Sequence, residues 1–186
     1  MHNYNDTHGR LPPAVVYGAD GEPLYSWRVL LLPYIEEEAL YKEFHRHEPW
    51  DSPHNLALLA RMPSSYAPPR GKAYKVPASH TVVHVFVGEG AAFEGAEGKR
   101  LPDDFPDGTS NTLLLVEAGT PVPWAKPEDL PYASDRPLPE LRSLFQDGFR
   151  ACRADGSLRW VKKETSEAAL RAAVTRNGNE SVGPDW

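Results

Sequence analysis

The chain has 186 residues, of which 40% are hydrophobic and 25% charged, a balance typical of a globular protein that excludes a disordered or fibrous one. Its 20 basic and 26 acidic residues give a net charge of −6, so it lacks the basic field that non-specific nucleic-acid binding needs. The single cysteine, Cys152, excludes an internal disulfide. Nineteen prolines and 14 glycines predict short elements joined by irregular connections.

The first predicted elements are helical. Ser26 can cap a short helical turn, and Pro33 suits the first position of a helix that runs to about Arg46. Ser52 followed by Pro53 is typical of a further helix start.

The pattern then changes to that of strands. Alternating apolar residues predict a strand over 80–87, and a run that is apolar on both faces predicts a central strand over 111–117. Residues 119–141 are rich in proline and show no periodicity, so we expect a long connection there.

The clearest local signal is a β-hairpin over 149–161, with Asp155 and Gly156 as a two-residue turn. Counting pairs outward from that turn gives one apolar face, which we expect to be buried and which carries Phe149, Ala151, Leu158 and Trp160. A last helix is predicted from about Ser166. Helices followed by antiparallel strands predict the α+β class.

The seven histidines suggest no metal motif. His80 and His84 lie four residues apart on one strand, about 13 Å, which is too far to share an ion. His45 and His47 lie at the end of a predicted helix and are expected to point in different directions, exposed to solvent.

The acidic segment 103–111 is a better candidate for an ion, because calcium prefers carboxylate and amide oxygens. Its candidate ligands are Asp103, Asp104, Asp107 and Asn111. It does not match an EF-hand, since Phe105 occupies a ligand position. The alternative, which we prefer, is a structural turn whose side chains bond backbone amides, and we therefore expect no cofactor.

Two segments with proline and tryptophan could line a groove for a peptide or solute, and their candidate ligand-binding residues are Trp50, Asp51 and Trp124. The preferred alternative is that these indoles fix long loops to the core. The sequence has no nucleophile elbow, phosphate loop or zinc-peptidase motif, and Cys152 is expected to be a half-buried structural thiol. We therefore expect no enzymatic activity.

Segments along nearly the whole chain resemble one family. They are HNYxDTxGRLPP (2–13), SWRVLLLPYIE (26–36), EPWDSPHN (48–55), DGTSNT (107–112), VPWxKPED (122–129) and ADGS (154–157). The family is a large planctomycete group of proteins of unknown function that are similar to type II secretion pseudopilins and are sometimes named solute-binding or transporter proteins.

The resemblance implies a pilin-like fold, in which an N-terminal helix with a membrane-embedded first half leads into an antiparallel sheet. On this basis we expect a single domain over residues 1–186, with residues 1–9 the remnant of that helix and the chain as given soluble. Because some pseudopilins bind calcium in a C-terminal loop, the resemblance also keeps segment 103–111 open as an ion site.

The function that the resemblance implies is a non-enzymatic structural or interaction domain of a secretion or pilus-like assembly. Its place would be the cell envelope, outside the cytoplasm. Its partners would be other pilin-like or secretion-apparatus proteins and not nucleic acid, with the membrane reached only through the missing helix. The alternative is a solute- or small-ligand-binding domain of a transport or sensory system.

The chain departs from the family at one position. Relatives carry a histidine ten residues before the Asp-Gly pair, and here that position is Phe145. A phenyl ring can neither hydrogen-bond nor bind metal as an imidazole does, so we expect Phe145 to pack with Trp160 in one core layer.

Overall fold

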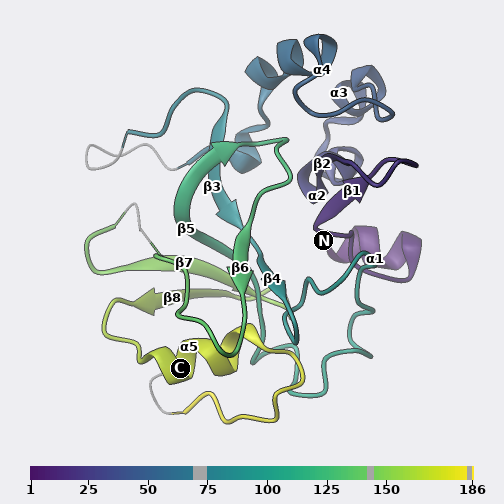
Figure 1. Ribbon diagram of the computed structural model, residues 1–186. Helices are drawn as coiled ribbons and strands as arrows, with labels where there is room; N and C mark the ends of the chain where they lie inside the picture. Colours follow the sequence, from purple (N-terminus) through teal and green to yellow (C-terminus); the bar gives the residue numbers. More distant parts are fainter. Residues whose placement is uncertain (69–74, 142–144, 184–185) are drawn as a thin grey trace.

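The computed structural model describes residues 1–68, 75–141, 145–183 and 186 (Figure 1). The first half is mostly helical with one small hairpin: α1 (His2–His8), β1 (Val15–Tyr17), β2 (Pro23–Ser26), α2 (Trp27–Leu30), η1 (Leu32–Ile35), α3 (Glu38–Glu43), α4 (Pro53–Leu58), η2 (Leu59–Arg61) and η3 (Ser64–Tyr66). The second half is mostly strands: β3 (His80–His84), β4 (Phe86–Gly88), β5 (Leu113–Pro123), β6 (Leu130–Tyr132), β7 (Gly148–Arg153), β8 (Leu158–Lys162) and the closing helix α5 (Glu167–Val174). The α+β class is therefore confirmed.

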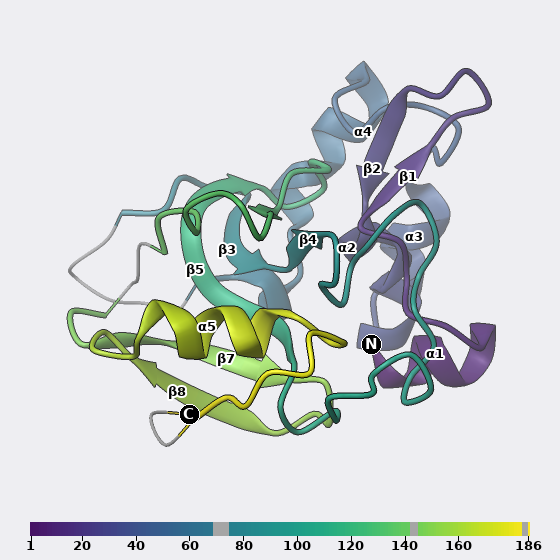
Figure 2. The same cartoon turned by 60° about the horizontal axis from the view of Figure 1, so that its bottom comes forward.

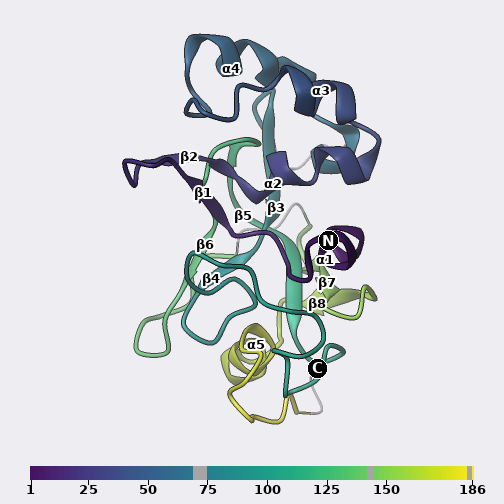
Figure 3. The same cartoon turned by 90° about the vertical axis from the view of Figure 1, so that its right-hand side faces the viewer.

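The main sheet is antiparallel and has the strand order β3-β5-β7-β8. Helix α5 lies across one face of it (Figure 2), where Ala173 and Val174 join Phe149 and Val161 in one apolar cluster. Two smaller sheets flank it, the antiparallel hairpin β1-β2 and the parallel pair β4-β6. In Figure 3 the helices α3 and α4 lie at one end of the molecule and α5 at the other.

The N-terminal helices begin as their caps predict. The hydroxyl of Ser26 accepts a hydrogen bond from the backbone N–H of Arg28, and the hydroxyl of Ser52 accepts one from the N–H of Asn55. The long helix predicted from Pro33 is wrong, because Glu36 adopts a left-handed φ of 66° that separates η1 from α3. In the described part of the chain, no helix has the length and apolar character needed to cross a bilayer.

Two strand predictions need correction. The strand expected over 80–87 is divided at Val85, where the chain leaves the main sheet (β3) and enters the small parallel sheet (β4). The connection expected over 119–141 holds the second half of β5 and all of β6. Strand β5 passes through an irregularity, because its pairing with β3 shifts from Glu117 to Val122, and Gly119 within it has a φ of 93° that suits glycine alone.

The β7-β8 hairpin is confirmed, but its predicted register is wrong by one residue. Ala154, Asp155 and Gly156 form a three-residue loop with Gly156 at φ 84°, so Cys152 pairs with Leu158. A shift of one residue moves every side chain of a strand to the other face. As a result, Val161 pairs with Phe149 on the buried face, whereas Leu158 and Trp160 lie on the opposite face and are 77% and 38% exposed.

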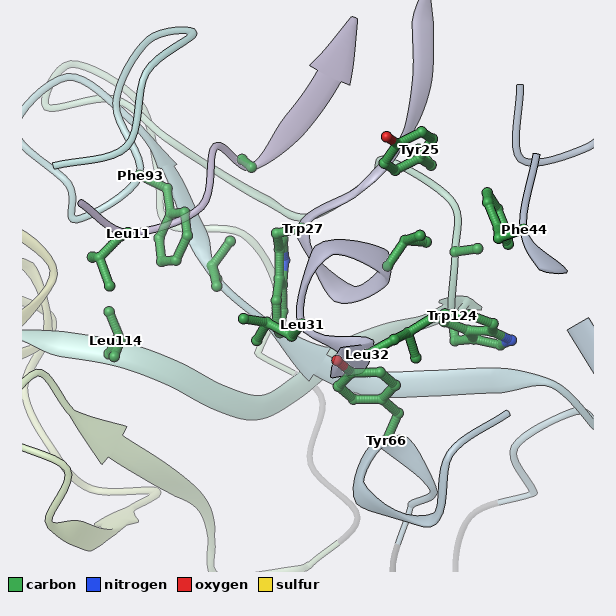
Figure 4. Packing of buried hydrophobic residues seen from close by; sticks show 14 of the residues in the cluster. Leu11, Tyr25, Trp27, Leu31, Leu32, Phe44, Tyr66, Phe93, Leu114 and Trp124 are labelled. Carbon is green, nitrogen blue, oxygen red and sulfur yellow. The ribbon is translucent and has the colours of Figure 1, made fainter. Parts of the chain in front are cut away.

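The interior contains two apolar clusters that meet at β5. The larger cluster holds the aromatic rings of the N-terminal half, and Figure 4 shows Tyr66 between Trp27, which it meets edge to face, and Trp124, which lies nearly parallel to it. The smaller cluster lies between the main sheet and α5. Because β5 gives Leu114 to the first cluster and Val116 to the second, one strand links both.

Candidate functional site

A buried ion pair lies at the centre of the molecule. The guanidinium of Arg28, on α2, donates a hydrogen bond of 2.6 Å to the carboxylate of Asp129, which precedes β6. Their side chains are 0% and 2% exposed. Burying two charges costs several kcal/mol for each ion unless the pair is closely matched and its remaining polar atoms are also bonded.

The remaining polar atoms of the pair are bonded. Asp129 also accepts from the indole N–H of Trp27 (3.1 Å) and the backbone N–H of Val85 (3.0 Å). Arg28 also donates to the hydroxyl of Ser26 (2.7 Å) and to the carbonyl of Val83 (2.6 Å). These bonds join α2, the β3-β4 segment and the loop before β6, so the centre fixes the N-terminal half to the sheet.

His84 is a further buried polar group beside this centre. Its Nε2 lies 3.0 Å from the carbonyl of Thr120 and therefore carries the proton, since a carbonyl can only accept. Its Nδ1 lies 3.5 Å from Asp129 and has no hydrogen-bond partner within the described residues. The bonds around Asp129 leave its carboxylate oxygens committed to N–H donors, which suits a structural role better than proton transfer.

A cavity of about 450 Å³ borders this centre. Its walls are Ala14, Val15, Val87, Pro127, Glu128, Asp129 and Pro131. Its volume lies within the range of small-molecule sites, about 300–1,000 Å³. Glu128 is the exposed charged residue of the lining, and its carboxylate forms an ion pair with Lys126.

The predicted ligand-binding residues lie in different environments. Trp124 is 0% exposed, donates its indole N–H to the carbonyl of Leu59 (3.2 Å) and contacts Tyr66 in the larger cluster. Trp50 is half-buried against the same cluster, and Asp51 is exposed. A fully buried indole cannot contact a solute, so Trp124 acts as a core residue here.

The predicted calcium ligands bond to separate partners. Asp104 binds the guanidinium and N–H of Arg100, bonds that lower the pKa of its carboxyl to about 2. Asp107 accepts from the backbone N–H of Asn179 (3.0 Å), and its own carbonyl accepts from the side chain of Asn111 (2.8 Å). Asp103 is exposed. The three carboxylates are thus not gathered around one point among the residues that the structure describes.

The outward face of the main sheet is more apolar than is usual for a face turned to solvent. Leu158 and Trp160 of β8 are exposed there, next to half-buried Leu115 and Cys152. A cavity of about 200 Å³ lies on this face, bordered by Ser65, Val83, Leu115, Val116, Glu117, Arg150, Ala151, Cys152 and Leu158. We refer to Leu115, Cys152, Leu158 and Trp160 as the outward patch.

Phe145 lies at the edge of the outward patch. Its ring meets that of Trp160 edge to face, with centroids 5.1 Å apart, and the guanidinium of Arg150 lies 5.2 Å from its centre. The two rings therefore meet as expected, but the expected core layer is wrong, because Trp160 is partly exposed and Phe145 is half-buried.

The thiol of Cys152 faces this patch without activation. Burial raises the pKa of the thiol, and nearby Asp155 raises it further. Its cross-strand neighbour is Leu158. The half-buried thiol agrees with the sequence-based expectation.

One sequence-based expectation about histidines is wrong. The rings of His45 and His47 do not diverge, because they lie nearly parallel with centroids 5.6 Å apart, and Glu48 contacts both. In the described ranges, these three residues are the group of histidine and carboxylate side chains close enough to share a metal ion.

Sequence reasoning missed Arg28, Asp129 and Glu48. A charged residue inside the apolar run that follows Trp27 was a usable signal, because a buried arginine requires a buried carboxylate. Nothing in the sequence identified which of 26 acidic residues would supply it. The contribution of Glu48 depends on a turn that no periodicity indicates.

A family model named SBP_bac_10, described as "Protein of unknown function (DUF1559)", matches residues 1–99, slightly more than half of the chain. The matched segment includes Arg28 and His84 but ends before Asp129. No curated protein and no solved structure matches the chain.

Proposed function

The chain belongs to the SBP_bac_10 (DUF1559) family of proteins of unknown function, and from this premise we propose that it is a non-enzymatic, pilin-like interaction domain. It acts in the cell envelope, outside the cytoplasm, as part of a secretion or pilus-like assembly. Its partners are other pilin-like or secretion-apparatus proteins, not nucleic acid.

The observation that carries this proposal is the outward patch. An antiparallel sheet normally turns a polar face to solvent when its other face is buried. Here the solvent-facing side carries Leu158 and Trp160, and exposed apolar side chains with an aromatic ring are typical of protein contact surfaces. Arg150 and Glu117, joined by an ion pair of 2.9 Å, border the patch as the polar rim of such a surface.

The attachment of α1 supports the pilin-like part of the proposal. The ring of His2 contacts the carbonyl of Ala154 in the β7-β8 loop (2.8 Å). The side chain of Asn5 bonds both the N–H and the carbonyl of Leu101. A helix of seven residues is too short to be stable in isolation, so these bonds hold it against the sheet domain, as an N-terminal helix is held in a pilin-like protein.

Photo-crosslinking in the cells that make the protein tests the proposal. A benzophenone amino acid at position 158 samples the outward patch, and the same amino acid at position 56 is the matched control, because Leu56 is also an exposed apolar residue (51%) but lies on α4. We expect position 158 to give a discrete crosslink, in the envelope fraction, to a pilin-like or secretion-apparatus protein.

Three results would contradict the proposal. One is equal crosslinking from positions 158 and 56. Another is a crosslinked partner of another class, and the third is recovery of the protein from the cytoplasmic fraction.

The cavity beside Asp129 favours the second candidate function, a solute-binding domain. A ligand that binds only the folded state raises the melting temperature, by an amount that grows with the logarithm of its concentration once that exceeds Kd. A solute that raises Tm by several degrees in the natural chain, but not in a Val87→Phe variant that fills the cavity, would support this candidate. If interaction is the function, we expect no such difference between the two proteins.

A further inference from the structure

The turn between α3 and α4 gathers three side chains that can ligate a metal. Nδ1 of His45 lies 3.0 Å from Oε1 of Glu48, and Nε2 of His47 lies 3.6 Å from the same oxygen. Ligand atoms of all three residues lie within 4.8 Å of one another. The side chain of His47 is 81% exposed, so an ion has free access and that ring can adjust its position.

The turn that carries these side chains is held by a buried asparagine. Asn55 is fully buried, and its side-chain oxygen accepts from the N–H of His45 (2.9 Å). Its side-chain amide donates to the carbonyls of His45 and Pro49, each at 3.0 Å. The backbone of the turn is therefore fixed from the core side before any ion arrives, which lowers the entropic cost of binding.

The carboxylate of Glu48 is oriented as well. The hydroxyl of Ser52 donates to Oε2 at 2.7 Å, which leaves Oε1 facing the two imidazoles. Hydrogen bonds of this kind to a ligating carboxylate are the usual support of a metal site.

The ring of His45 is fixed by His54. The two imidazoles stack with centroids 3.5 Å apart and an angle of 3° between their planes. His54 is held by the carbonyl of Glu43, 2.8 Å from its Nε2. The stacked His54 ring limits rotation of the His45 ring, so Nδ1 of His45 stays directed at Glu48.

We propose that His45, His47 and Glu48 form a site for a divalent transition metal of the zinc class. Zinc bonds of about 2.0–2.1 Å in tetrahedral geometry place the ligand atoms about 3.3 Å apart, a value between the two distances from Oε1. Two imidazole nitrogens and one carboxylate favour zinc, copper or nickel over calcium and magnesium. Three protein ligands leave a fourth position for water or for a group from a partner.

Titration calorimetry of the full chain, without an affinity tag, tests the site with ZnCl₂ and, in parallel, CaCl₂. We expect one zinc ion per chain and no heat from calcium at the same concentrations. Bound Co²⁺ should give the visible absorption of a low-coordinate site, and this spectrum should disappear on addition of zinc.

His47→Gln and Glu48→Gln should each weaken zinc binding by at least about tenfold. The exposed position of His47 makes its replacement harmless to folding, and far-UV circular dichroism checks this point. His8→Gln is the matched control, because His8 is an exposed histidine on α1, and it should bind zinc as the natural chain does.

Three results would overturn the proposal: no zinc binding by the natural chain, equal affinity in the His47→Gln variant, or a preference for calcium. Loss of binding in His8→Gln would also contradict it, since zinc would then bind at α1 and not at the turn between α3 and α4. None of these results depends on the proposed interaction function.

Discussion

The charge of Asp129 matters to the stability of the protein because it is the buried counter-charge of Arg28. In Asp129→Asn the side chain keeps its shape, but the guanidinium of Arg28 stays buried without a counter-charge. Breaking a buried pair from one side costs about 3–5 kcal/mol, so we expect the free energy of unfolding to fall by about that amount. Urea denaturation followed by circular dichroism measures it.

Glu38→Gln provides the control for Asp129→Asn. Glu38 forms an ion pair of 2.8 Å with Lys42, but both side chains are exposed on α3. Exposed pairs of this kind contribute little to stability, so the urea midpoint should not move. A similar loss of stability in both variants would show that burial of the Arg28–Asp129 pair does not make its loss more costly than that of an exposed pair.

At the scale of elements, the β7-β8 loop depends on Gly156. Its φ of 84° is left-handed, and an added Cβ would lie 3.1 Å from the ring of His2. We expect Gly156→Ala to lower the free energy of unfolding by about 1–2 kcal/mol. Gly156→Asn should cost less, because asparagine tolerates this conformation better than alanine. Equal losses for Ala and Asn, measured by urea denaturation, would show that backbone strain is not the cause.

The bonds between Arg100 and Asp104 should make the free energy of unfolding depend on pH in the acidic range. The folded state lowers the pKa of Asp104 to about 2 through its bonds to Arg100, whereas the ordinary value for aspartate is about 3.9. A lowered folded pKa means that the contribution is fully present above the unfolded pKa and is lost as the pH falls towards 2.

Asp104→Asn removes this contribution, so its stability should fall less steeply than that of the natural chain between pH 4 and pH 2. Urea midpoints at each pH measure the difference. Parallel profiles for the two proteins would contradict the assignment.

The elements with local signals were predictable, and those that depend on long-range contacts were not. Ser26 and Ser52 mark helix starts because a cap acts within three residues of the sequence. The hairpin was predictable from Asp155-Gly156, but its register was not, because an Asp-Gly pair fits both a two-residue turn and a three-residue loop that ends in glycine. This difference of one residue in loop length decides whether Trp160 is buried or exposed.

The candidate sites depend even more on distant contacts. Arg28 and Asp129 are 101 residues apart, and the Asn55 clamp on the His45 turn spans ten. The expected divergence of His45 and His47 was wrong because a helix was assumed to continue to Arg46, whereas α3 ends at Glu43 and a turn follows.

At the scale of the whole molecule, the two clusters should unfold together. Strand β5 contributes to both, so losing one exposes apolar surface of the other. We expect Leu40→Ala, in the larger cluster, and Val161→Ala, in the smaller one, each to lower the urea midpoint of one shared unfolding transition. Tryptophan fluorescence, to which buried Trp27 and Trp124 contribute with three other tryptophans, should change at the same urea concentration as the circular dichroism signal of the whole chain. Two separate transitions would contradict the prediction of a single domain.

The distance along the chain between Arg28 and Asp129 also affects folding during synthesis. A ribosome adds about 5–20 residues per second, so Arg28 emerges about 5–20 s before the carboxylate that neutralises it, 101 residues later. During that interval burial of the guanidinium without its counter-charge is unfavourable, so we expect Arg28 to stay in water and the N-terminal half to remain incompletely folded. The segment made first is therefore expected to complete its folding only after the loop before β6 has left the exit tunnel.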